Sequence, residues 1–415
     1  MTNAKLRVEI ENTIRGPFIL SVLQMKQSLL LSFSFIIPLL VICGMLVAIL
    51  SNPYLVTAQV QEQEGQQQQP LSLNDIFNKV EKSVVQITRS VLPPANILTP
   101  ESQENTTSLG SGFVYDNSGH IVTNYHVIAN ASIVDVTFID GNRYTANVSG
   151  IDPSNDLAVL KIIENFTGDE LLSQPPLILG NSSQLKVGDP VVAIGNPFGL
   201  EGSMTTGIVS QTGRLLPEEQ EGGYSIPDTI QTDALINPGN SGGPLLNMNA
   251  EIIGVNTAGI FPGSIGFAIS SNSVSKIVPV LIEEGNYTHP WLGMSAGTLS
   301  SDIAKREGLD RSVNGIIVDS IVKNGPADQA GINGSTTNQY GERLGGDIIT
   351  AADGNPVVRM EDLISYLEIQ KSPGENMTLS VFRDGKSTDK QITIGHRPTT
   401  TTAYLSRAPP QQPSP

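Results

Sequence analysis

The chain of 415 residues is long enough for two or three domains of ordinary size. Its net charge of −16 at pH 7 argues against a nucleic-acid-binding protein, which needs a basic surface. Because the sequence contains one cysteine, Cys43, an intramolecular disulfide is excluded. The 40 glycines and 27 prolines predict many turns between short strands.

The N-terminal region contains an apolar run, LLLSFSFIIPLLVICGMLVAIL, at residues 29–50. These 22 residues carry no charge and are long enough to cross a bilayer as a helix, in which Pro38 is tolerated. Basic residues precede the run, and the next basic residue after it is Lys79. The positive-inside rule therefore predicts a cytoplasmic segment at residues 1–28, a single-pass membrane anchor, and an extracytoplasmic remainder.

A cleaved secretory signal is the alternative interpretation of this run, because Val56-Thr57-Ala58 resembles a cleavage site. The run is longer than a usual signal core, which favours a retained anchor. Weak support for export comes from Asn-x-Ser/Thr sequons, all of which follow the run: Asn105, Asn130, Asn147, Asn165, Asn181, Asn286, Asn333 and Asn376.

The residues after the anchor form a linker and then a β-rich domain. Residues 51–70 include QVQEQEGQQQQP, which has too little apolar content to form a core. Residues 71–285 contain short β-branched runs separated by Gly, Asn, Asp and Pro, a pattern typical of antiparallel β-barrels or sandwiches. Residues 271–284, SNSVSKIVPVLIEE, predict a helix that ends this domain despite Pro279.

A second domain is predicted at residues 288–397. It contains the strand-like runs GIIVDSIV and MTLSVFRDG, and EDLISYLEIQ has apolar residues at the spacing of a helix. Residues 398–415 are rich in Pro and Thr and predict a disordered tail.

The strongest chemical motif is NPGNSGGPL, in which Ser241 follows Gly239 and Asn240. Acyl transfer needs a hydroxyl on a tight turn whose backbone N–H groups converge on the developing oxyanion. Glycines permit such a turn and leave space for substrate. Ser241 is therefore the candidate nucleophile, and Gly239, Asn240 and Ser241 are the candidate oxyanion loop, with the N–H groups of Gly239 and Ser241 as donors.

Two further residues complete a candidate triad. His126 directly follows the strand-like IVTNY, whereas His120 is interpreted as part of a charge-flanked loop. Asp156 precedes the apolar run LAVL, where a buried carboxylate needs a hydrogen-bond donor such as a histidine. Asp152 is the rival carboxylate, but it lies in a Pro-containing turn, where aspartates usually bond their own backbone.

The order His126, Asp156, Ser241 is that of chymotrypsin-like proteases. It predicts that Ser241 attacks the scissile carbonyl, that His126 transfers the proton, and that Asp156 orients the imidazole. Four scattered histidines and one cysteine in the apolar run suggest no metal site, and no cofactor is expected.

Several segments resemble the HtrA/DegP family of serine proteases, among them GSGFVYDNSGHIVTNYHVI, NDLAVLKI, VGDPVVAIGNPFGL and QTDALINPGNSGGPLLN. The resemblance covers about residues 75–395. It implies a mainly β fold, a chymotrypsin-like double β-barrel followed by an α+β PDZ domain. It also implies a cofactor-free protease of unfolded or damaged extracytoplasmic proteins that assembles as a homotrimer or larger homo-oligomer. By the same resemblance, Ile265, Gly266 and Phe267 wall the specificity pocket, which favours small aliphatic residues.

The resemblance extends to the second domain, where Trp291, Leu292, Gly293 and Met294 are similar to the carboxylate-binding loop of PDZ domains. Such a loop presents backbone N–H groups to a peptide C-terminus, and the peptide adds a strand to the sheet edge. Two segments depart from the family pattern: INGSTTNQYGERLG after Gly331, and a variable stretch at 91–109. Two alternative functions remain: a chaperone-like or peptide-sensing scaffold, and a protease dedicated to one membrane partner.

Overall fold

A computed structural model describes residues 71–91, 106–163, 174–197, 202–217, 225–260, 265–306, 308–310, 312–337 and 343–398. The chain divides into two compact units, Met1–Gln69 and Pro70–Pro415, and all described residues belong to the second. The predicted cytoplasmic segment, anchor, linker and most of the C-terminal tail therefore lie outside the described residues. Within the described ranges, no helix is both long and apolar enough to cross a membrane.

The first domain begins with helix α3 (Leu73–Val80), whose N-terminus is closed by a capping box between Ser72 and Asp75. A closed antiparallel barrel follows, in the order β1-β2-β3-β6-β5-β4. Its strands are β1 (Val84–Val91), β2 (Thr106–Val114), β3 (His120–Thr123), β4 (Ile133–Thr137), β5 (Arg143–Asp152) and β6 (Leu157–Ile162).

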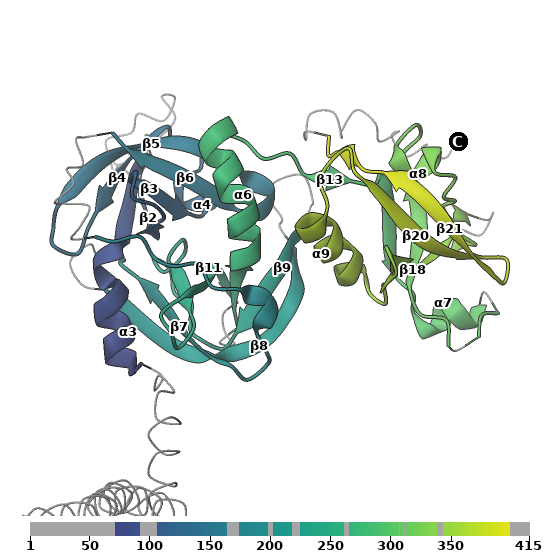
Figure 1. Ribbon diagram of the computed structural model, residues 1–415, viewed down its shortest axis with the longest axis horizontal. Helices are drawn as coiled ribbons and strands as arrows, with labels where there is room; N and C mark the ends of the chain where they lie inside the picture. Colours follow the sequence, from purple (N-terminus) through teal and green to yellow (C-terminus); the bar gives the residue numbers. More distant parts are fainter. Residues whose placement is uncertain are drawn as a thin grey trace, which may run out of the picture. The chain divides into compact units, whose positions relative to one another are not determined.

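A second closed barrel has the order β10-β11-β12-β9-β8-β7 (Figure 1). Its strands are β7 (Pro190–Gly195), β8 (Ser203–Pro217), β9 (Ser225–Thr232), β10 (Pro244–Leu246), β11 (Ile252–Ile260) and β12 (Ile265–Ser270). The short β-branched runs left barrels and sandwiches open, and the structure has two closed barrels, as the family resemblance implied.

Helix α6 (Ser271–Glu284) ends the double barrel, as predicted. The Ser270 hydroxyl caps its first turn by accepting the Ser273 N–H, and Gly285 ends it in a left-handed conformation. The helix packs on β5 and β6 of the first barrel and on β11 and β12 of the second. Its buried face, including Val274 and Leu281, shares one apolar core with both barrels and thereby holds them together.

The second domain is built on one sheet with the order β14-β15-β18-β20-β21, which places β14 at an edge. The strands are β14 (Met294–Thr298), β15 (Ile316–Ile321), β18 (Ile348–Ala352), β19 (Asn355–Pro356), which pairs with β18, β20 (Asn376–Arg383) and β21 (Lys386–Thr393). Helices α7 (Ser301–Arg306), α8 (Pro326–Gln329) and α9 (Met360–Gln370) accompany it, and β13 (Pro290–Trp291) pairs with β22 (Gly395–His396). The helix predicted from EDLISYLEIQ is α9, which packs against β8 and β9 of the second barrel.

The segment after Gly331 contains a small two-stranded ladder of β16 (Thr336–Thr337) and β17 (Arg343–Leu344). Residues 338–342 between them lie outside the described residues, and so does most of the variable stretch at 91–109.

Candidate active site

Asp156 lies at the end of a single helical turn that joins two paired strands. Strand β5 ends at Asp152, the turn η2 (Pro153–Asn155) follows, and Asp156 adopts left-handed φ and ψ of 51° and 40° before β6 begins. Asp156 is buried, with only 1% of the residue exposed, so its carboxylate depends on protein donors.

Three donors from two other segments satisfy this carboxylate. The His126 Nδ1 atom lies 2.8 Å from Asp156 Oδ2, and the His126 backbone N–H donates to Oδ1 at 2.9 Å. The Thr257 hydroxyl donates to Oδ2 at 2.6 Å. The structure therefore brings together His126 and Asp156, which the sequence paired, and adds Thr257.

The rival carboxylate, Asp152, bonds the backbone of its own turn, as the sequence predicts, but it also has a second partner. Its Oδ1 atom accepts the Ser154 N–H at 3.1 Å, which is a bond to its own turn. It also contacts His289, a partner that the sequence did not indicate.

His126 lies on the short helix α4 (Tyr125–Ile128) that follows β3. The backbone carbonyl of Asp156 accepts the Asn124 side-chain amide at 3.0 Å and the Tyr125 N–H at 3.1 Å, which fixes this segment against the turn. The His126 side chain is 44% exposed while that of Asp156 is 2% exposed. The imidazole is thus anchored on its buried side and accessible on the other.

Ser241 follows a tight turn formed by Asn237-Pro238-Gly239-Asn240. The Asn240 N–H donates to the Asn237 carbonyl at 2.9 Å, and Gly239 has a φ of +97°, the geometry of a type II turn with Pro and Gly at its centre. In the described part of the chain, the N–H groups of Gly239 and Ser241 carry no hydrogen bond to the protein. Asn240 thus contributes its backbone to the turn, and its N–H is not available as an oxyanion donor.

The loop carrying Ser241 is fixed against the first barrel. The Ser111 N–H of β2 donates to the Ser241 carbonyl at 2.8 Å, and the Ser111 hydroxyl donates to the Gly239 carbonyl at 2.5 Å. Gly242 has a φ of +85°, and a Cβ atom there would lie 2.1 Å from the Ser111 carbonyl oxygen. Only glycine permits this close approach, which places the nucleophile where the two barrels meet.

Thr257 connects the two halves of the site and was not identified from the sequence. It lies at a register shift in the β11–β12 pairing, between Asn256 and Ala258. A bulge of this kind redirects side chains at functional sites. Its hydroxyl donates to Asp156, and its carbonyl accepts the Ser241 hydroxyl at 3.1 Å. A threonine within an ordinary strand-like run carries no sequence signal for this position.

The residues predicted to wall the specificity pocket begin strand β12. Gly266 pairs with Gly259, and Phe267 pairs with Ala258, next to Thr257 on β11. Gly266 is buried, and a Cβ atom there would lie 2.7 Å from the Ile236 side chain. Ile265 to Phe267 therefore lie beside the strand that carries Thr257, close to the loop of Ser241.

The predicted carboxylate loop, Trp291 to Met294, enters the edge strand β14. The Gly293 carbonyl accepts the Val322 N–H at 2.8 Å, and the Leu292 carbonyl accepts the Ala327 N–H at 2.9 Å. Gly293 adopts a left-handed φ of +71°. The loop is thus held by its carbonyls at the start of an edge strand, the position at which PDZ-type peptide addition occurs.

His120 differs from its interpretation as a loop residue. It begins β3, where its backbone pairs with Lys161, and its Nδ1 atom lies 2.6 Å from Asp116 Oδ2. The flanking charge that suggested a loop is the partner of this histidine. In the described ranges, no cluster of three His, Cys, Asp or Glu side chains is arranged to hold a metal ion.

Comparisons with known proteins agree with this architecture. A family model described as a trypsin-like peptidase domain matches residues 110–255, and a PDZ domain model matches residues 290–394. The chain is 39% identical over 302 residues to a protein of Chlamydia trachomatis named "Probable periplasmic serine endoprotease DegP-like"; the match covers 72% of this chain and 56% of that protein. This chain therefore spans little more than half the length of this relative.

Two further matches cover more of the protein compared. A Marinomonas protein of the same name is 35% identical, and the match covers 84% of this chain and 68% of the relative. The solved structure "HtrA-type protease AlgW with decapeptide" has a TM-score of 0.59 and 32% identity, and covers 79% of this chain and 99% of that one. The chain belongs to the HtrA/DegP family of trypsin-like serine proteases with a C-terminal PDZ domain.

Proposed function

We propose that this chain is a serine endopeptidase with Ser241 as nucleophile, His126 as general base and acid, and Asp156 as the carboxylate that orients it. The observation that carries the proposal is the buried Asp156 carboxylate, which contacts His126 Nδ1 at 2.8 Å and the Thr257 hydroxyl at 2.6 Å. The backbone carbonyl of the same Thr257 accepts a hydrogen bond from the Ser241 hydroxyl, so Thr257 joins the three predicted residues in one hydrogen-bonded centre.

The geometry supports the following sequence of steps. The Ser241 oxygen attacks the scissile carbonyl while its proton passes to Nε2 of His126, since Nδ1 already faces Asp156. The resulting imidazolium is stabilised by the buried carboxylate. The proton then passes to the leaving amine, and water repeats the cycle on the acyl-enzyme.

The oxyanion of the tetrahedral intermediate would be bound by the N–H groups of Gly239 and Ser241. The type II turn leaves both groups without a protein acceptor in the described part of the chain, whereas the Asn240 N–H is used within the turn. Donors that are already oriented stabilise charge as it develops, without reorganisation during the reaction.

The substrates that fit the family are unfolded or damaged proteins outside the cytoplasm, cut after small aliphatic residues selected beside Ile265, Gly266 and Phe267. The PDZ domain would bind peptide C-termini at the Trp291–Met294 loop, with the peptide adding a strand to β14. Support comes from the edge position of β14 and from relatives named as periplasmic endoproteases.

Residues 29–50 would anchor the protein as a single-pass membrane helix, with both domains extracytoplasmic, and the protein would assemble as a homotrimer or larger homo-oligomer. External protease added to intact cells should remove an epitope near residue 400 and spare one near residue 10. Recovery of a mature chain beginning near Gln59 would show instead that the run is a cleaved signal.

The proposed activity is tested by incubating the purified protein with an unfolded casein-like substrate. The wild type should degrade it, and Ser241→Ala should reduce the rate by about three orders of magnitude or more, because only binding and oxyanion contributions remain. A scaffold without protease activity would leave the substrate intact in both samples. A protease dedicated to one partner would cut a short peptide but not casein.

A further inference from the structure

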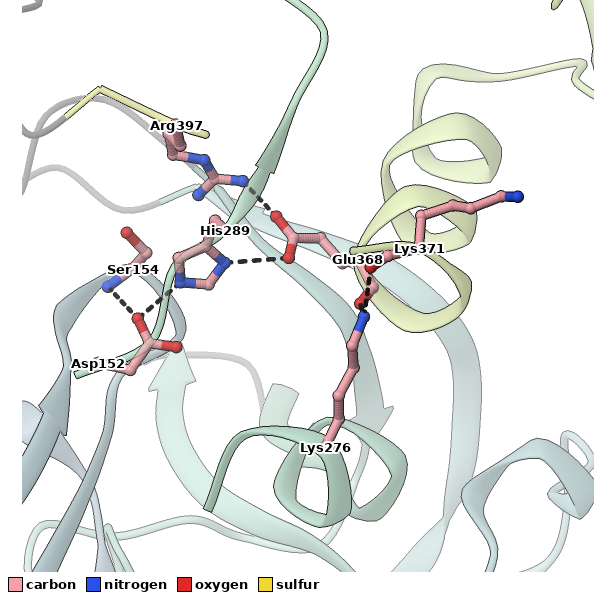
Figure 2. A network of polar contacts seen from close by, with 7 residues as sticks. All are labelled: Asp152, Ser154, Lys276, His289, Glu368, Lys371 and Arg397. Carbon is pink, nitrogen blue, oxygen red and sulfur yellow. Dashed lines mark hydrogen bonds and ion pairs between the residues drawn. The ribbon is translucent and has the colours of Figure 1, made fainter. Parts of the chain in front are cut away.

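A buried histidine lies between the two domains, outside the proposed active site. His289 follows α6 in the segment that leads to β13 and is 5% exposed. Its Nε2 atom lies 2.8 Å from Asp152 Oδ1 of the first barrel, and its Nδ1 atom lies 3.0 Å from Glu368 Oε2 of helix α9 (Figure 2). One imidazole therefore bridges a carboxylate of the protease domain and a carboxylate of the PDZ domain.

This bridge requires a charged imidazole. A neutral histidine donates from one ring nitrogen only, whereas both nitrogens here face carboxylate oxygens, which only accept hydrogen bonds when ionised. Burial lowers the pKa of His289, but the charges and hydrogen bonds of Asp152 and Glu368 outweigh it and raise the pKa to about 9. His289 is thus an imidazolium at neutral pH.

The surrounding elements hold the PDZ side of the bridge in place. The Arg397 guanidinium contacts Glu368 Oε1. The backbone N–H of Arg397 donates to the backbone carbonyl of His289 at 3.0 Å. Lys276 of α6 donates to the backbone carbonyls of Glu368 and Lys371 at the C-terminal end of α9. The phenol ring of Tyr287 packs edge-on against the imidazole, with ring centroids 4.9 Å apart.

The protease side of the bridge ends at the turn that carries the proposed catalytic carboxylate. Asp152 is the residue before η2, and Asp156 is the residue after it. Asp152 is 2% exposed, its Oδ2 atom has no partner among the described residues, and its Oδ1 atom is shared between His289 and the Ser154 N–H. Without His289, this buried carboxylate would keep, among the described residues, the Ser154 backbone N–H of its own turn as a donor.

On the PDZ side, the bridge is connected through helix α9 to the edge strand at which peptide binding is predicted. Glu368 lies in the last turn of α9, whose first residue, Met360, donates its N–H to the Thr298 hydroxyl at the end of β14. Helix α9 is therefore attached at one end to the edge strand and at the other to His289.

We propose that His289 is a positioning residue for the hydrolytic reaction: by bridging Asp152 and Glu368, it fixes the turn that presents Asp156 and makes this placement depend on the PDZ helix α9. The proposal rests on the proposed protease function. Displacing a catalytic group by about 1 Å can lower a rate by about 100-fold, so a small shift of η2 is sufficient to affect turnover.

The test compares kcat and KM of the full-length protein for a short peptide that occupies the protease site. His289→Gln, which keeps the approximate volume but not the charge, should lower kcat by about 10- to 100-fold with KM changed less than about twofold. His289→Arg, which retains a charge and donors on both sides, should restore most of kcat. The matched control is His120→Gln, which removes another carboxylate-paired histidine on the first barrel and should leave kcat within about twofold.

Active-site titration with a fluorophosphonate corrects each rate for the fraction of folded enzyme. If His289→Gln matches His120→Gln in kcat, the proposal is overturned. If His289→Gln does not fold, the pH dependence decides: wild-type kcat should fall as pH rises past about 9, where His289 loses its proton, and His289→Arg should lack this fall. Identical alkaline profiles would overturn the proposal.

The failure of the proposed function has a different signature. In that case the wild type would show no Ser241-dependent cleavage at any pH, and Ser241→Ala would equal the wild type.

Discussion

Replacement of Thr257 by valine tests the hydrogen-bonded centre of the site. Valine has nearly the same shape as threonine but lacks the hydroxyl that donates to Asp156 Oδ2 at 2.6 Å. The backbone carbonyl that accepts the Ser241 hydroxyl remains. The substitution therefore removes one defined donor from a carboxylate whose side chain is 2% exposed, and it keeps a β-branched side chain at this position.

The expected magnitude follows from the strength of this bond. Hydrogen bonds to charged groups contribute about 1.5–3 kcal/mol, and water cannot replace the donor at a buried oxygen. Asp156 is needed most when His126 becomes an imidazolium in the transition state. If the loss falls on that state, kcat/KM should decrease by about 10- to 150-fold.

The assay is cleavage of a short peptide by Thr257→Val and Thr257→Ser, with thermal unfolding followed by circular dichroism. Thr257→Ser keeps the hydroxyl and should retain kcat/KM within about threefold of the wild type. A Thr257→Val enzyme that is folded and as active as the wild type would refute the role assigned to this residue.

Three further results are expected. Gly242→Ala should lower the free energy of unfolding by at least about 2 kcal/mol in urea denaturation, because a Cβ would lie 2.1 Å from the Ser111 carbonyl oxygen at a left-handed φ of +85°; a stable, active variant would contradict this geometry. His289→Gln should lower stability by about 3 kcal/mol at pH 6, because its pKa is raised from 6.5 to about 9. This difference should shrink as pH rises through about 9, and a difference independent of pH would refute it. Full-length protein should bind peptides with a free, hydrophobic C-terminus at about micromolar affinity, and amidation should abolish most of the binding measured by fluorescence anisotropy; equal binding of both forms would exclude Trp291–Met294 as a carboxylate site.

Much of the fold could be predicted because its signals are local. Short β-branched runs between turn residues predicted antiparallel barrels or sandwiches, and the apolar spacing of EDLISYLEIQ predicted helix α9. The interpretation of His120 as a loop residue was wrong because charge near a strand end was taken for a loop, when Asp116 is its hydrogen-bond partner.

The candidate triad could be predicted because its motifs combine rare residue types with glycines that the geometry requires. The sequence separately identified His126 and Asp156, which lie in contact. Thr257 and the bridge through His289 could not be predicted in this way. The role of Thr257 depends on a register shift in β11. The bridge joins His289 to Asp152, 137 positions away in the chain, and to Glu368, 79 positions away. Neither contact leaves a local pattern.

The most direct test of the central claim is covalent labelling of the purified protein by a fluorophosphonate, read by peptide mass spectrometry. Such a reagent reacts with a serine whose proton is removed by a neighbouring base. The wild type should gain one adduct, on the peptide containing Ser241, and His126→Ala should label far more slowly. An adduct on another residue, or labelling of Ser241 at an unchanged rate in His126→Ala, would contradict the assignment of Ser241 as a nucleophile activated by His126.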